Sequence, residues 1–224
     1  MIKTILFDLD GTLLNTIDDL ADAANWVCMQ RGWPTFTVEQ YKHMVGNGIP
    51  KLVERFSPEG CRTPAQLAET LAQFTARYDA HKEDKTAPYP GIPQLLKDLR
   101  AEGIRSAVFS NKADALCSGI IDHYFAPGSF AAVRGSRPGV PVKPDPAGLY
   151  SLMEELGASK ASTLFVGDSN VDIATGHNAG LPALGAVWGF RGAEELTAAG
   201  ADELVYQPAD ILAYIRRANG SRQG

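Results

Sequence analysis

Residues 5–13 read ILFDLDGTL, an apolar run that ends in two aspartates, Asp8 and Asp10. Moving an unpaired carboxylate from water into an apolar interior is costly. We therefore expect the chain to leave the core at Asp8, and both acids to hold a cation or take part in chemistry. An apolar run without polar alternation is typical of a strand in a parallel sheet that is covered on both faces.

Similar short apolar runs recur along the chain and alternate with longer segments of helical period. This alternation predicts an α/β fold, a doubly wound parallel (Rossmann-like) sheet with about one helix per crossover. The expected strands span residues 3–8, 104–110, 163–168, 182–187 and 203–206, and the expected helices span residues 92–102, 113–123, 146–156, 171–179, 192–199 and 209–217.

Residues 16–85 break the alternation, because helical patterns follow one another there without a convincing strand. We expect these residues to form a small α-helical cap domain of four helices. The cap is inserted into an α/β catalytic core of residues 1–15 and 86–224. The turn-rich APYPG at 87–91 marks the return of the chain to the core.

The 224-residue chain has 45% hydrophobic residues and a formal net charge of -5. A negative charge disfavours nucleic acid and anionic membranes as partners. No apolar stretch approaches the roughly 20 residues of a membrane span, and the three cysteines are too scattered for a zinc site or a disulfide framework. We expect a cytoplasmic protein that binds a small molecule, as a monomer or a homodimer, with a disordered tail at 218–224.

Polar groups stand at the carboxyl ends of the predicted strands and on a neighbouring loop, which is where ligands bind in an open α/β sheet. They are Asp8 with Asp10, Ser110 with Asn111, Lys143 in a KPDP run, and Asp168 with Asp172. Brought together, they supply a carboxylate nucleophile, oxygen ligands for Mg²⁺, a hydroxyl and an ammonium for phosphoryl oxygens, and a separate acid or base. This set predicts phosphoryl transfer through a covalent aspartate.

Four motifs carry a family resemblance: FDLDGT at 7–12, SN at 110–111, KPDP at 143–146 and GDSNVD at 167–172. In this order they resemble the motifs of the haloacid dehalogenase superfamily of phosphohydrolases. The helical insert resembles the subfamily with an α-helical cap, and VGNGIPKLVERF at 45–56 is similar to the phosphoglycolate phosphatases and their relatives. The resemblance implies a magnesium-dependent phosphomonoester hydrolase that acts on a small phosphorylated metabolite, phosphoglycolate first.

The resemblance also implies a role for each acid. Asp8 would attack phosphorus to form an aspartyl phosphate, and Asp10 would protonate the leaving alkoxide and then activate water. Mg²⁺ would lie between the Asp8 carboxylate, the Asp10 main-chain carbonyl and Asp168. Asp172 would support these ligands from behind.

The phosphoryl group itself would be held by polar groups from three segments. Gly11 and Thr12 belong to the turn after the first strand, where Thr12 would also brace the turn. Ser110 and the Asn111 amide would bind phosphoryl oxygens, and the Lys143 ammonium would neutralise their charge.

Substrate selectivity is expected from the cap, because the core recognises only the phosphoryl group and the metal. The segment 45–56 places a Gly-Asn-Gly turn, with Asn47 at its centre, before a helix that carries Lys51 and Arg55. These two cations are four residues apart and share one helix face. Either could meet a carboxylate such as that of glycolate, with Lys51 the nearer; a solvated cationic stripe is the alternative.

Several other activities compete with a phosphoglycolate phosphatase. A pyrophosphatase, a nucleotidase and a sugar-phosphate phosphatase or mutase of the same superfamily remain open. Asp10 argues against a dehalogenase and a phosphonate hydrolase, and the insert argues against a signalling receiver domain. A complete set of site residues argues against a catalytically silent binding protein. The sequence assigns no role to Arg134 and Arg137 in the proline-rich loop 129–144.

Overall fold

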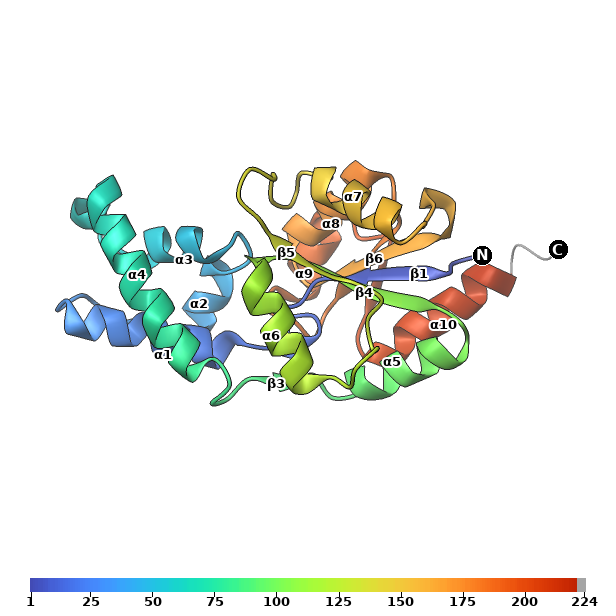
Figure 1. The fold of residues 1–224 in the computed structure, drawn as a ribbon, viewed down its shortest axis with the longest axis horizontal. Coiled ribbons are helices and arrows are strands. Elements are labelled where there is room, and N and C mark those ends of the chain that lie inside the picture. Colours follow the sequence, from blue (N-terminus) through green and yellow to red (C-terminus); the bar gives the residue numbers. More distant parts are fainter. Residues whose placement is uncertain (221–224) are drawn as a thin grey trace. The chain divides into compact units, whose positions relative to one another are not determined.

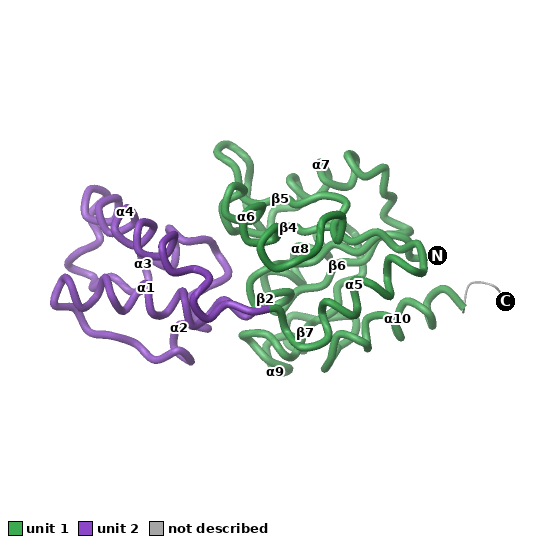
Figure 2. The backbone as a smooth tube through the Cα atoms, turned by 60° about the horizontal axis from the view of Figure 1, so that its bottom comes forward, with its two compact units in different colours: residues 1–14, 88–224 green, residues 15–87 purple. Residues whose placement is uncertain are grey.

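The computed structural model describes residues 1–220. The chain forms two compact units (Figure 2). One, called the α/β unit below, comprises residues 1–14 and the chain from residue 88 onward. The other, the helical unit, comprises residues 15–87.

The α/β unit is built on one six-stranded sheet in the order β5-β4-β1-β6-β7-β8, whose neighbouring strands are parallel. The strands are β1 (Thr4–Phe7), β4 (Arg105–Ala113), β5 (Val133–Ser136), β6 (Thr163–Gly167), β7 (Ala183–Ala186) and β8 (Glu203–Val205). Phe7 at the end of β1 pairs in register with Val108 of β4 and Val166 of β6. Because these strands are parallel, their carboxyl ends lie at the same end of the sheet, where β4 runs on beyond Val108 to Ala113.

Side chains of β1 alternate between the two faces of the sheet, as the pleat requires. Ile5 and Phe7 belong to a core shared with α5 (Ile92–Ala101), α6 (Asp114–Tyr124) and α10 (Pro208–Gly220). Leu6 belongs to a second core with α7 (Ala147–Glu155) and the end of α8 (Asn170–Ala179), while α9 (Gly192–Ala198) packs beside α8. Helices thus cover both faces (Figure 1), and the predicted doubly wound α/β fold is confirmed.

The helical unit contains α1 (Ile17–Gln30), α2 (Val38–Met44), α3 (Ile49–Phe56) and α4 (Pro64–His81), which agree with the four predicted helices. Thr37 and Thr63 start α2 and α4 with capping boxes. The described chain also holds the 3₁₀ turns η1 (Glu59–Cys61) and η2 (Lys160–Ser162) and a two-stranded ladder of β2 (Leu14–Asn15) with β3 (Ala87–Pro88).

A buried acid in α1 ties the two ends of the helical unit together. Asp19 accepts hydrogen bonds from the backbone N–H groups of Lys85 and Thr86 and from the Thr86 hydroxyl, at 2.7–3.1 Å. The sequence marks Asp19 only as an acid in a first helical turn, so this contact between the start and end of the insert is a finding of the structure.

Two expectations are corrected by the fold. The proline-rich loop contains the edge strand β5, which Arg134 and Arg137 anchor by ion pairs to Glu155 and Asp114. The expected disordered tail is wrong for residues 218–220, which continue α10; the Asn219 side chain there bonds both backbone groups of Ile2. The rest of the predicted tail, residues 221–224, lies outside the described residues.

No helix within residues 1–220 is both long enough and apolar enough to span a membrane.

Candidate active site

The turn after β1 places Asp8 at the carboxyl end of the strands. The Asp8 N–H still extends the ladder by donating to Val166 O at 2.9 Å, and its side chain is buried. The chain then reverses tightly, because Gly11 has a φ of 87° and its N–H donates to Leu14 O at 2.8 Å. A positive φ of this kind favours glycine, which explains the glycine that follows the two acids in the sequence.

Asp168, at the end of β6, is held against that turn. Its Oδ2 accepts the Phe190 N–H at 2.7 Å, and its Oδ1 lies 3.4 Å from the Thr12 hydroxyl that donates to it. A Cβ added at Gly11 would lie 2.2 Å from Asp168 Oδ2, and one added at Gly189 would lie 2.2 Å from Asp168 Cβ. Both glycines therefore allow the backbone to approach this carboxylate closely.

Lys143 joins two of the predicted acids. Its Nζ lies 2.8 Å from Asp8 Oδ1 as an ion pair and donates a hydrogen bond to Asp172 Oδ1 at 2.6 Å. The other Asp172 oxygen accepts from the N–H and hydroxyl of Ser169, the N-cap of α8, at 3.1 and 2.6 Å. Both oxygens of Asp172 are thus engaged by protein groups.

The acids of this cluster disturb one another's ionisation. Burial and the charges of Asp172 and Asp10 raise the pKa of Asp8 from 3.8 to about 6, against the opposing pull of Lys143. Burial and the charges of Asp172 and Asp8 likewise raise the pKa of Asp168 well above its usual value. Burial lowers the pKa of Lys143, but the two neighbouring carboxylates outweigh it and raise the pKa overall. Like charges held together in this way are typical of functional sites.

The donor set fits a divalent cation. One oxygen from each of Asp8, Asp168 and Asp172 lies within 4.8 Å of the others, and all three residues are buried. Lys143 pairs with two of them, Asp8 and Asp172, and the three carboxylates together with this ammonium carry an excess of two negative charges when all are ionised. Oxygen ligands with this excess charge match what Mg²⁺ binds in proteins.

The residues predicted to bind phosphate lie at the same carboxyl end of the strands. Ser110 and Asn111 are buried near the end of β4, two and three residues beyond the Val108 that pairs with Phe7. The Asn111 side chain accepts the Lys143 N–H at 2.8 Å and donates to Lys143 O at 3.3 Å. It therefore also fixes the backbone that carries the Lys143 ammonium.

One charged residue at this end of the strands was not predicted from the sequence. Lys112 follows Ser110 and Asn111, and its Nζ lies 3.0 and 3.3 Å from the two carboxylate oxygens of Asp10. The only signal available was its position directly after the SN motif, since a lone lysine is otherwise a common surface residue. The loop of Gly189 and Phe190 was missed as well, because no polar side chain marks it.

The three predicted cap residues lie in the helical unit. Arg55 donates to Met44 O at 2.5 Å and to Asn47 Oδ1 at 2.8 Å, so it braces the Gly-Asn-Gly turn. Lys51 pairs with both carboxylate oxygens of Glu54 at 2.8 Å on the exposed side of α3. The proposed role of these residues in substrate selection stays a prediction.

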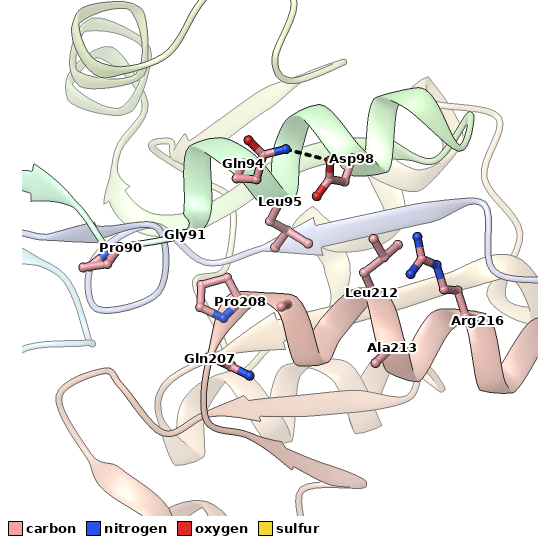
Figure 3. A pocket seen from close by; sticks show the side chains of 11 residues that line it. Pro90, Gly91, Gln94, Leu95, Asp98, Gln207, Pro208, Leu212, Ala213 and Arg216 are labelled. Atoms are coloured by element: carbon pink, nitrogen blue, oxygen red, sulfur yellow. Dashed lines mark hydrogen bonds between the residues drawn. The ribbon is translucent and has the colours of Figure 1, made fainter.

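A hollow of about 350 Å³ lies elsewhere in the α/β unit, between α5 and α10 (Figure 3). Its charged and amide groups already have partners: Gln94 donates to Asp98 at 2.8 Å, and Arg216 pairs with Glu102. It holds no cluster of acids comparable with the one at the strand ends, so shape alone does not identify the reactive site.

Comparisons with known proteins identify the family of the chain. The family described as haloacid dehalogenase-like hydrolase matches residues 5–186. A phosphoglycolate phosphatase of Caulobacter vibrioides is 32% identical over 210 residues, covering 93% of this chain and 88% of the relative. One of Vibrio parahaemolyticus is 31% identical over 216 residues, covering 94% and 95%.

Solved structures show the same likeness over nearly the whole chain. A crystal structure described as a predicted phosphoglycolate phosphatase from Haemophilus somnus has a TM-score of 0.89 at 29% identity, covering 96% of this chain and 98% of that one. CbbY from Rhodobacter sphaeroides in complex with phosphate has a TM-score of 0.79 at 26% identity, covering 94% and 96%.

The fold and the clustered acids define an α/β protein with a helical insertion and a candidate cation site at the carboxyl ends of its strands. The chain belongs to the haloacid dehalogenase-like hydrolase family.

Proposed function

We propose that the protein is a magnesium-dependent phosphatase that hydrolyses a small phosphomonoester, phosphoglycolate in the first place, through an aspartyl phosphate. The observation that carries the proposal is the buried cluster of Asp8, Asp168 and Asp172 around a single Lys143. The names of the relatives support the choice of phosphoglycolate.

Asp8, Asp168 and the main-chain carbonyl of Asp10 would hold Mg²⁺, with Asp172 behind them. When bound, the ion supplies positive charge to the phosphoryl oxygens. Asp172 keeps Lys143 in place through its 2.6 Å hydrogen bond, while Ser169 fixes the other Asp172 oxygen. The protein thus arranges the site before any substrate enters, which lowers the cost of reorganisation during the reaction.

The reaction proceeds in two displacements at phosphorus. In the first, a carboxylate oxygen of Asp8 forms a bond to phosphorus while the bond to the leaving oxygen breaks, and Asp10 gives that oxygen a proton. In the second, Asp10 takes a proton from water, the water oxygen attacks the same phosphorus, and the bond to Asp8 breaks to release phosphate. Lys143 and Ser110 balance the charge of the phosphoryl group in both steps.

The helical unit acts as the cap in this proposal, with Asn47, Lys51 and Arg55 as its candidate specificity residues. Cap units of this kind can exclude water during a reaction and contribute to substrate selection. A sugar-phosphate substrate is the second candidate, because CbbY, 26% identical to this chain, was also crystallised with xylulose 1,5-bisphosphate. A pyrophosphatase and a nucleotidase are the remaining alternatives.

A turnover panel tests the proposal. Phosphoglycolate, p-nitrophenyl phosphate, pyrophosphate, nucleoside monophosphates and sugar phosphates are each assayed with Mg²⁺ and with EDTA. We expect phosphoglycolate to have the highest kcat/KM and EDTA to abolish turnover. Asp8→Asn should lower kcat by about 10⁴ or more, as loss of one member of a catalytic unit commonly does. Turnover of none of these esters, or near-normal activity of Asp8→Asn, would refute the assigned chemistry.

A further inference from the structure

The two aspartates of the first motif each have an ammonium partner of their own. Lys143 pairs with Asp8 and Asp172, whereas Lys112 donates to both oxygens of Asp10. The Lys112 side chain is only 2% exposed, while that of Asp10 is 21% exposed. A buried ammonium is costly unless a carboxylate compensates it, so the structure ties the position of Asp10 to that of Lys112.

The backbone of Lys112 is held at the end of β4, in a stretch where the pairing of β4 with β5 is irregular. Strand β4 runs on to Ala113, the Lys112 N–H donates to the Ser110 hydroxyl at 3.3 Å, and Lys112 O accepts from the Cys117 thiol at 3.5 Å. Strand β5 packs closely beside it, since a Cβ added at Gly135 would lie 2.4 Å from Lys112 O. These contacts fix the backbone from which the Lys112 side chain starts, and a fixed backbone aims a side chain reproducibly.

We propose that Lys112 is a positioning residue, an inference that rests on the proposed function. Lys112 holds the Asp10 carboxyl in the orientation needed to protonate the leaving oxygen. Asp10 lies in a turn beyond the end of β1 and has the more exposed side chain, so it needs such a partner. Lys112 acts through Asp10 and does not itself touch the phosphoryl group. The same ammonium could instead serve to attract a carboxylate of the substrate, and a substrate comparison separates these two roles.

The comparison uses three esters: p-nitrophenyl phosphate, ethyl phosphate and phosphoglycolate. p-Nitrophenolate leaves readily without a proton, whereas the alkoxides released from ethyl phosphate and from phosphoglycolate need one. Ethyl phosphate has no carboxylate, and phosphoglycolate has one. The measured quantity is kcat/KM, which covers the steps up to the breaking of the ester bond. Lys112→Met removes the charge at similar length, and Lys97→Met, at an exposed position of α5, is the matched control.

We expect Lys112→Met to lower kcat/KM about tenfold or more for ethyl phosphate and phosphoglycolate alike, but less than about threefold for p-nitrophenyl phosphate. General acid catalysis commonly contributes about 10²–10⁴-fold, and a misplaced acid forfeits part of that. Lys97→Met should leave all three values unchanged. Circular dichroism checks the fold; should Lys112→Met not fold, Lys112→Gln, which keeps a donor without the charge, replaces it.

Other outcomes overturn the inference. Equal losses on all three esters would mean that Lys112 supports the fold or phosphate binding in general. A loss confined to phosphoglycolate would make it a carboxylate-binding residue. If phosphoglycolate is not a substrate, ethyl phosphate against p-nitrophenyl phosphate still decides the role of Lys112. A wild-type protein that turns over none of the esters refutes the proposed function, and the positioning role with it.

Discussion

Replacing Asp8 by asparagine should make the metal-free protein more stable at neutral pH, although under the proposed function it should abolish turnover. The pKa of Asp8 is raised from 3.8 to about 6 in the folded protein, by burial first and then by the charges of Asp172 and Asp10. Folding therefore favours the protonated carboxyl. The stability that this proton contributes is fully present below about pH 4 and is lost as the pH rises through about 6.

The size of the effect follows from the same shift. The pKa of Asp8 is 3.8 in the unfolded chain and about 6 in the folded protein. This difference corresponds to about 3 kcal/mol of folding free energy, which is lost once Asp8 is ionised. The amide side chain of the Asp8→Asn variant cannot ionise, so this variant avoids the loss. Its free energy of unfolding in EDTA should exceed that of the wild type by about 3 kcal/mol at pH 7.5 and equal it near pH 4.

Urea denaturation followed by circular dichroism, from pH 4 to pH 8 in EDTA, measures the difference. Asp22→Asn, which removes one acid of an exposed ion pair with Lys85, is the control and should change stability by less than about 1 kcal/mol. Saturating Mg²⁺ should restore the wild type, since a ligand at a hundred times its Kd adds about 2.7 kcal/mol. Equal stability of wild type and Asp8→Asn at pH 7.5, or a difference independent of pH, would refute the reasoning.

Three further substitutions test other parts of the structure. Gly189→Ala puts a Cβ 2.2 Å from that of Asp168, so calorimetry should show Mg²⁺ affinity reduced by about 10–100-fold. Unchanged affinity would mean that the close approach of Gly189 to Asp168 is not needed for metal binding. Asp19→Ala leaves the backbone N–H of Thr86 without its buried acceptor, and urea denaturation should show a loss of about 2–3 kcal/mol; a loss below about 0.5 kcal/mol contradicts this. Lys51→Ala should raise KM for phosphoglycolate about tenfold, or ~1.4 kcal/mol, and leave p-nitrophenyl phosphate unaffected; parallel changes in both substrates argue against a carboxylate contact.

The strands and helices could be predicted because their signals are local. The run before Asp8 is apolar on both faces, and β1 is fully buried where the run predicts it. The four helices of residues 15–87 carry their own periodicity and, at Thr37 and Thr63, their own caps. Strand β5 was missed because an edge strand needs no continuous apolar run: Val133 is only half-buried, and ion pairs hold the strand from the outside.

The acids of the site could be predicted because a charge at the end of a buried strand is conspicuous. The groups that position them could not, since their role depends on distances between distant segments. Phe190 holds Asp168 through a backbone N–H, a group that every residue except proline carries. Lys112 donates a hydrogen bond to Asp10, which lies 102 residues away in the sequence. Asn111 was predicted as a phosphate ligand, but nothing in the sequence indicated that its side chain would hold Lys143.

The charges of the site suggest why the two lysines have different partners. Lys112 and Asp10 form a balanced pair, so the proposed acid and base carries little net charge with its partner. In the cluster of Asp8, Asp168 and Asp172, Lys143 pairs with Asp8 and Asp172, and the three acids with this lysine keep two negative charges in excess when ionised. A phosphate ester that also carries two negative charges would be repelled by that excess in a poorly solvated site. Under the proposed function a divalent cation would offset that excess, and it would also oppose the burial and the charges of Asp172 and Asp10 that raise the pKa of Asp8.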